Sequence, residues 1–106
     1  MVIKLTKDNF KQEVELSEMP IIIDVSAAWC GPCQQMKPIF EKTAQALSAT
    51  YKFIELNVDE SRDLAIHYGV TSVPTFIFIK NGTIMGKERG YMPQDELTSK
   101  INQYLG

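Results

Sequence analysis

Short β-like runs and longer helix-like stretches alternate along the whole chain. Residues 21–25, Ile-Ile-Ile-Asp-Val, are almost continuously apolar, which is typical of a strand buried on both faces in the middle of a sheet. Two further strands are predicted at 2–5 and 51–58. Segments 75–80 and 83–87 flank Asn81-Gly82, and this dipeptide predicts a two-residue turn between antiparallel strands.

The longest predicted helix runs from Cys33 to about Ala49. Its main apolar positions recur at helical spacing and are Met36, Phe40, Ala44 and Leu47. Pro38 lies in the second turn, and we expect it to kink the helix because it lacks a backbone N–H.

Three shorter helices complete the pattern. Thr6 can cap a predicted helix over 7–16. A second short helix is predicted over residues 61–68, with Asp59 or Ser61 at its start. The last helix begins at or near Pro93. The alternation predicts an α/β fold, with a central mixed sheet of about five strands flanked by four helices.

Composition limits the possible classes of protein. With 106 residues, 44% of them apolar, we expect one domain over 1–106. A formal net charge of −2 without runs of like charge predicts no nucleic-acid-binding surface. The first ten residues lack a secretory pattern and no apolar run could span a bilayer, so we expect a cytoplasmic protein that does not bind membranes.

The chain has two cysteines, Cys30 and Cys33. They are too few for a disulfide framework, and the single His67 leaves a zinc site incomplete. His67 is instead expected on the surface at a helix end. In the cytosol, a disulfide between the two cysteines would be transient.

The position of the two cysteines predicts their chemistry. They follow the buried strand and open the long helix, and a helix N-terminus favours a thiolate at Cys30. Cys33 can then resolve a mixed disulfide formed at Cys30. Gly31 and Pro32 make the tight connection and place no bulky group over the sulfur.

The chain resembles the thioredoxin family over nearly its whole length. The resemblance rests on the block Trp29-Cys30-Gly31-Pro32-Cys33, Asp24 six positions before Cys30, Pro38, Val73-Pro74-Thr75 and Gly90. It implies a thioredoxin fold and the reduction of disulfides in target proteins by dithiol-disulfide exchange. It also implies that electrons come from NADPH through thioredoxin reductase. The chain has no Gly-rich dinucleotide-binding loop, so we expect it to bind no cofactor itself, and we expect a monomer. Its partners would be disulfide-containing proteins, that reductase and peroxiredoxins.

Asp24 is an acid within an apolar strand, where burial should raise its pKa above that of an ordinary Asp. The resemblance supports a proton relay, in which Asp24 takes a proton from Cys33 through water. An edge-facing or capping Asp is the alternative. Glu55 shares one strand face with Phe53 and Asn57, and a second carboxylate beside Asp24 would raise its pKa further. Glu55 could instead simply reach solvent.

The resemblance also implies a cis Val73–Pro74 peptide bond beside the cysteines, which leaves the Val73 backbone free to pair with an extended substrate. An ordinary trans proline at a strand start is the alternative. Trp29 is expected to be a recognition residue, although it could belong to the core. The complete docking patch would comprise Trp29, Gly31, Pro32, Val73, Pro74 and Gly90, with Tyr91 as a further candidate. Met36 and Met85 are predicted to pack in the core.

Two other functions stay open at the level of sequence. One is a thioredoxin-fold binding or chaperone module whose partners need the docking patch and not the thiols. The other is a dedicated electron donor to one peroxidase.

Overall fold

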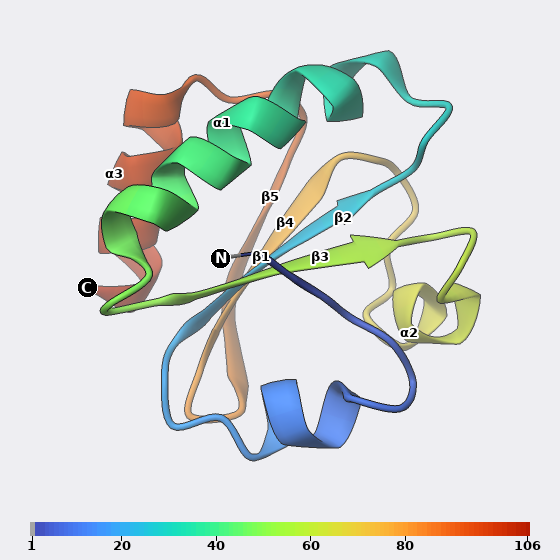
Figure 1. Ribbon diagram of the computed structural model, residues 1–106, viewed down its shortest axis with the longest axis horizontal. Helices are drawn as coiled ribbons and strands as arrows, with labels where there is room; N and C mark the ends of the chain where they lie inside the picture. Colours follow the sequence, from blue (N-terminus) through green and yellow to red (C-terminus); the bar gives the residue numbers. More distant parts are fainter. Residues whose placement is uncertain (1) are drawn as a thin grey trace.

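A computed structural model describes residues 2–106 and has a five-stranded sheet at its centre (Figure 1). The strands are β1 (Val2–Lys4), β2 (Ile21–Ser26), β3 (Lys52–Asn57), β4 (Thr75–Lys80) and β5 (Thr83–Arg89). Their order is β1-β3-β2-β4-β5, with β1, β3 and β2 parallel and β4 antiparallel to both of its neighbours. The predicted mixed sheet is confirmed, and the apolar run forms its central strand.

The helices are η1 (Lys11–Glu15), α1 (Gly31–Leu47), α2 (Arg62–His67) and α3 (Gln94–Leu105). Figure 1 shows α1 and α3 on one face of the sheet and η1 and α2 on the other. The long helix α1 begins at Gly31, two residues before its predicted start at Cys33, and it continues through Pro38. The last helix begins directly after Pro93, as the sequence indicates.

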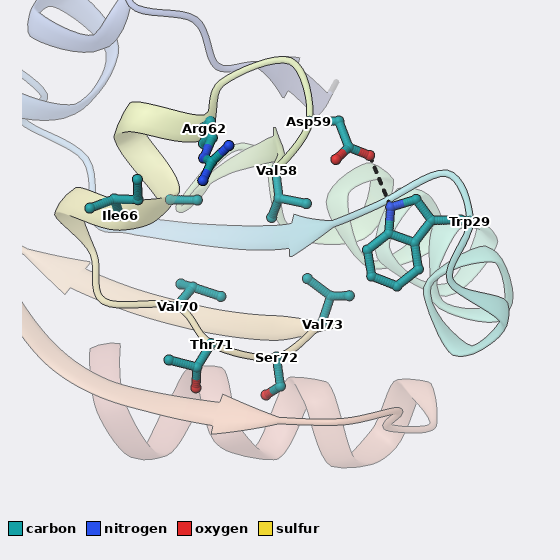
Figure 2. Close-up of a pocket in the computed structure, with 10 residues that line it drawn as sticks. Trp29, Val58, Asp59, Arg62, Ile66, Val70, Thr71, Ser72 and Val73 are labelled. Carbon is teal, nitrogen blue, oxygen red and sulfur yellow. Dashed lines mark hydrogen bonds between the residues drawn. The ribbon is translucent and has the colours of Figure 1, made fainter.

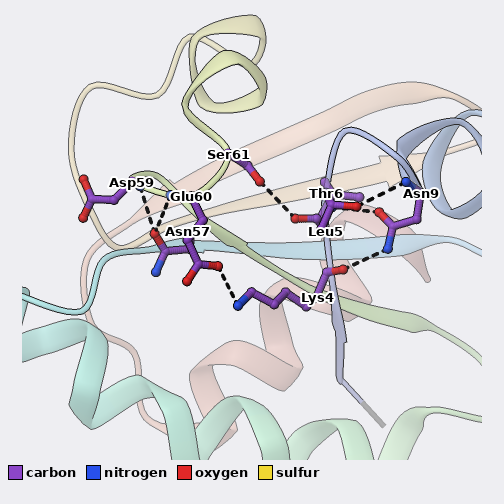
Figure 3. A network of polar contacts seen from close by, with 8 residues as sticks. All are labelled: Lys4, Leu5, Thr6, Asn9, Asn57, Asp59, Glu60 and Ser61. Carbon is purple, nitrogen blue, oxygen red and sulfur yellow. Dashed lines mark hydrogen bonds and ion pairs between the residues drawn. The ribbon is translucent and has the colours of Figure 1, made fainter.

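The helix predicted over residues 7–16 is correct only in its second half. A short π-helix, η1, is closed by the N–H of Leu16 donating to the carbonyl of Lys11 at 2.8 Å. Before it, the N–H of Thr6 donates to Oδ1 of Asn9 at 2.8 Å, and the N–H of Asn9 donates to Oγ1 of Thr6 at 3.3 Å (Figure 3). These side chains offer the backbone an alternative to helical hydrogen bonds, so a turn replaces the first helical turn.

The sheet separates two hydrophobic cores, and alternate residues of β2 point into each. Ile22 packs with the core under α1 and α3, whereas Ile21, Ile23 and Val25 pack on the opposite side. Asp24, two positions after Ile22, lies on the face that α1 covers. The carboxyl side chain is therefore placed beneath the N-terminal half of α1.

The β4–β5 hairpin has the predicted two-residue turn. Asn81 and Gly82 have φ values of 53° and 76°, and two successive positive φ angles are what a type I′ turn requires. Met85 on β5 is 46% exposed, so its predicted place in the core is wrong. The strand β5 lies at the edge of the sheet, where no other layer covers the side chain of Met85. Met36 is fully buried, as predicted.

Candidate active site

The two cysteines form a disulfide at the start of α1. Cys30 is the N-cap residue of the helix, and the backbone N–H of Cys33 donates to its Sγ at 3.2 Å. Gly31 and Pro32, the first two helical residues, are exposed, whereas Cys30 and Cys33 are only 6% and 3% exposed. The N–H of Cys33 thus points at the Cys30 sulfur at the N-terminal end of the helix, an arrangement that stabilises negative charge there.

The loop before β4 lies against the disulfide. The Val73–Pro74 peptide bond is cis, the conformation that the family resemblance implies, and the Cys30 Sγ lies 3.7 Å from the carbonyl oxygen of Val73. The N–H of Gly90 donates to the carbonyl of Pro74 at 2.9 Å, and Gly90 has a φ of 92° that favours glycine. Val73, Pro74 and Gly90 are therefore brought to the same side of the redox pair.

A polar cavity of about 90 Å³ lies on the other side of the disulfide. It is lined by Cys33 and Asp24 together with Ser26, Ala27, Ala28, Gln34, Lys37, Glu55 and Asn57. Asp24 is 3% exposed in the central strand, and its buried Oδ1 has no hydrogen-bond partner. The edge-facing alternative for Asp24 is therefore wrong. A polar cavity of this size has room for ordered water that could join Asp24 to the Cys33 sulfur.

The electrostatics of the cavity follow from burial and from a second acid. The pKa of Asp24 is raised to about 7. Burial is the main cause, and the negative charge of Glu55 raises it further. Glu55 is directly opposite Asp24 in the β2–β3 register and is half-buried. Near neutral pH, Asp24 is thus present in both its protonated and its ionised form.

An open groove of about 340 Å³ lies beside the disulfide, between α2 and the loop before β4 (Figure 2). Trp29 stands at one end of it and is 71% exposed, so it belongs to the surface and not to the core. Its Nε1 donates to Oδ2 of Asp59 at 3.0 Å. The indole is therefore held in place although it is exposed.

Asp59 is a residue of this site whose role the sequence does not indicate. The side-chain Oδ1 of Asn57 accepts the N–H groups of Asp59 and Glu60 at 2.8 and 3.1 Å, which orders the loop after β3 (Figure 3). That loop then presents the Asp59 carboxylate to Trp29. The sequence pattern marks Asp59 only as a helix opener, because a hydrogen bond across 30 residues leaves no local signal.

The thioredoxin family model matches residues 1–103. The chain belongs to the thioredoxin family. It is 33% identical to the thioredoxin of Haemophilus influenzae over 104 residues, which are 98% of this chain and 97% of that one. It is equally similar, over the same shares, to the thioredoxin of Porphyra purpurea. Thioredoxin 1 of Synechococcus elongatus is 35% identical over 101 residues, or 95% of this chain and 94% of that one.

Family and site together show the activity of this thioredoxin-family chain. It is a protein-disulfide oxidoreductase with two cysteines three positions apart. The family match and the intact cysteine pair do not favour a binding module that works without thiols or a donor dedicated to one peroxidase. Membership of the thioredoxin family also implies disulfide-containing substrates and a reductase as partners.

The described part of this thioredoxin-family chain was also compared with the requirements of a metal site and of a membrane-spanning helix. Between residues 2 and 106, no group of three or more His, Cys, Asp or Glu side chains could hold a metal ion. No helix in the described part is long and apolar enough to cross a membrane. His67 is exposed at the end of α2, as predicted, with its ring against Phe10.

Proposed function

We propose that Cys30 is the attacking nucleophile in the reduction of target disulfides. Its thiolate bonds to one sulfur of the target, which breaks the target disulfide and releases the other sulfur as a thiolate. The position of Cys30 at the N-cap of α1 supports this role, because the helix dipole stabilises the thiolate. The product of this step is a mixed disulfide between Cys30 and the target.

Cys33 then resolves the mixed disulfide with the help of Asp24. The Cys33 thiol gives its proton, through water, to the Asp24 carboxylate, and the new thiolate attacks the Cys30 sulfur. The Cys30–Cys33 disulfide forms and the second target thiolate leaves, so two electrons have passed to the target. The cavity shared by Cys33 and Asp24, and the unpartnered Oδ1 of Asp24, support this role.

The target is held by an extended segment that pairs with the backbone of Val73, next to Pro74. Trp29, Gly31, Pro32 and Gly90 would complete the contact surface around the disulfide, with Tyr91 at its margin. Support comes from the exposure of Trp29, Gly31, Pro32 and Tyr91 and from the short distance between Cys30 and Val73.

The electron source and the cellular context also belong to this proposal. Residues 1–106 act as one domain and as a monomer in the cytoplasm, in electron transport from NADPH through thioredoxin reductase to target proteins. Peroxiredoxins are among these targets. The resemblance to the family supports each of these points.

One observation carries the assignment of roles: Cys30 lies against Val73 and Cys33 lies against the Asp24 cavity. The test incubates reduced Cys33→Ser and Cys30→Ser proteins with a disulfide-containing protein such as insulin. We expect Cys33→Ser to accumulate a mixed disulfide on Cys30 that dithiothreitol releases, and Cys30→Ser to accumulate none. Accumulation on Cys33 in the Cys30→Ser protein would reverse the assignment.

A further inference from the structure

The groove beside Trp29 is apolar along its floor and charged on one wall. The floor residues are Val58, Ala65, Val70 and Val73. The hydroxyl-bearing residues Thr71 and Ser72 form one rim, and Asp59 and Arg62 line the opposite side (Figure 2). Arg62 is therefore the one cation among the residues that line this groove.

Arg62 begins α2, and Figure 2 shows its guanidinium turned toward the groove. Ala65 and Ile66 follow at three and four positions and lie on the same helix face. This face of α2 thus presents a cation at its N-terminal end and apolar side chains at its C-terminal end. Ile66 is 64% exposed, so the apolar end is open to a ligand.

Two acidic residues near Arg62, Asp59 and Glu60, are bound to other residues. Asp59 accepts the hydrogen bond from Trp29, and Glu60 pairs with Lys4 at 2.5 Å. Over residues 2–106, Arg62 takes part in no ion pair and no side-chain hydrogen bond. A guanidinium has five N–H donors in a planar fork that fits a carboxylate, and here that fork is left for a ligand.

We propose that Arg62 selects target segments that carry a carboxylate side chain within about six residues of the attacked cysteine. The inference rests on the proposed function, because the target cysteine must lie at Cys30. Apolar side chains of an extended segment would cover the groove floor, and the carboxylate would form a charge-assisted pair with Arg62. A carboxylate nearer to Asp59 would be repelled, so the preference depends on position along the segment.

The test uses short peptides with one cysteine, activated as the neutral 2-thiopyridine disulfide. Each matched set holds three peptides that differ at one position only, which carries Asp, Asn or Lys. From set to set this position moves along the peptide, up to six residues from the cysteine. The second-order rate constant for reaction with the reduced protein is measured as thiopyridine release. The proteins are the wild type, Arg62→Gln, Arg62→Glu and a matched control, Lys42→Gln, which removes one positive charge from the exposed side of α1.

In the wild type, we expect the Asp peptide to react about fivefold faster than the Asn peptide at one or two neighbouring positions, and the ratio to fall in 1 M salt. Arg62→Gln should bring the ratio close to one, and Arg62→Glu should favour Lys at the same position. Lys42→Gln should keep the wild-type ratio. Because each ratio is taken within one protein, a general change in activity cancels.

Three results would overturn the inference. The wild-type ratio could be near one at every position, or Arg62→Gln could keep the preference. The rate constants could also fall as the protein concentration rises, which would assign the groove to a second copy of the chain. Failure of the proposed function is a different result, in which the wild type releases thiopyridine from none of the peptides, the Asn peptides included.

Discussion

The two sides of the Cys30–Cys33 disulfide differ in size, polarity and access. On the Cys30 side lies an open groove of about 340 Å³ with an apolar floor and an exposed Trp29. On the Cys33 side lies a polar cavity of about 90 Å³ that contains the buried Asp24. One helix N-terminus separates the two, so neighbouring sulfurs three positions apart meet different environments.

This difference separates two tasks that disulfide exchange requires. A target must approach one sulfur from solvent, and an exposed apolar surface suits many protein partners. A proton must leave the other sulfur, and a buried carboxylate with a raised pKa suits that transfer near neutral pH. A change on one side should therefore affect target binding, and a change on the other should affect proton transfer and stability.

The largest expected effect is on stability and comes from Asp24→Asn. In the unfolded chain the Asp24 carboxyl has the ordinary aspartate pKa of 3.8, whereas in the folded protein its pKa is raised to about 7. Between these values the unfolded state binds fewer protons, so the wild type loses stability as pH rises. At pH 8 the variant should be more stable by up to about 4 kcal/mol, and at pH 3 the gain should vanish.

The measurement is urea unfolding of wild type and variant across this pH range. Asp63→Asn, which removes a carboxyl from an exposed position of α2 outside the cavity, is the matched control and should lack this gain at pH 8. A gain for Asp24→Asn that is the same at pH 3 and pH 8 would show that its carboxyl is not the group that titrates.

The next largest effect is on the chemical step of the cavity side. Asp24→Asn should slow the release of the target from the mixed disulfide by about 100-fold, because general base catalysis contributes at least that much in many enzymes. Formation of the mixed disulfide at Cys30 should change much less. Single-turnover experiments with acid quenching separate the two steps.

The defect should shrink toward high pH, where hydroxide can remove the proton instead of Asp24. If Asp24→Asn slowed both steps equally, Asp24 would act on Cys30 as well as on Cys33. The two sides of the disulfide would then not have the separate tasks described above.

Local sequence patterns were sufficient to predict the framework that carries this asymmetry. The continuous apolar run predicted β2 as the central strand, and Asn81-Gly82 predicted the turn, because both signals lie within a few neighbouring residues. The order of strand, Cys30 and helix followed in the same way. Residues 7–16 were predicted less well because Asn9 hydrogen-bonds across its own turn.

The groove could not be predicted because its residues meet only in the folded chain. Asp59 contacts Trp29 across 30 positions, and Arg62 enters the groove through the orientation of α2. No spacing in the sequence marks either residue. The prediction that Met85 packs in the core was wrong for a related reason, since the exposure of a strand depends on its position in the sheet.

A smaller effect is expected on the groove side from Trp29→Ala. The indole is a large exposed anchor next to Cys30, and such anchors often dominate binding. The variant should lower kcat/KM for a protein substrate such as insulin by about 10-fold, a typical loss for one aromatic contact. A small disulfide that does not reach the groove should react at nearly the wild-type rate.

Leu16→Ala is the matched control, because Leu16 is also an exposed apolar side chain but follows η1 and is not among the residues that line the groove. It should leave both rates unchanged. An equal fall for the small disulfide in Trp29→Ala would mean that Trp29 acts on the sulfur chemistry and not on target binding.

The smallest effect tests how the cavity raises the pKa of Asp24. Burial is the leading cause and the Glu55 charge the second, so Glu55→Gln should lower the pKa of Asp24 only partway and leave it above that of an ordinary Asp. A carboxyl-carbon NMR titration measures this shift. Glu60→Gln removes an exposed acid that is paired with Lys4, and should leave the Asp24 titration unchanged.

The titration can contradict this account in two ways. A wild-type Asp24 that titrates like an ordinary Asp would remove the basis for a proton relay near neutral pH. A Glu55→Gln protein in which Asp24 falls to the ordinary value would mean that the neighbouring charge, and not burial, controls the carboxyl. Since Glu55 is half-buried, salt would then screen the effect, and the Cys33 side would respond to ionic strength as the Cys30 side does through Arg62.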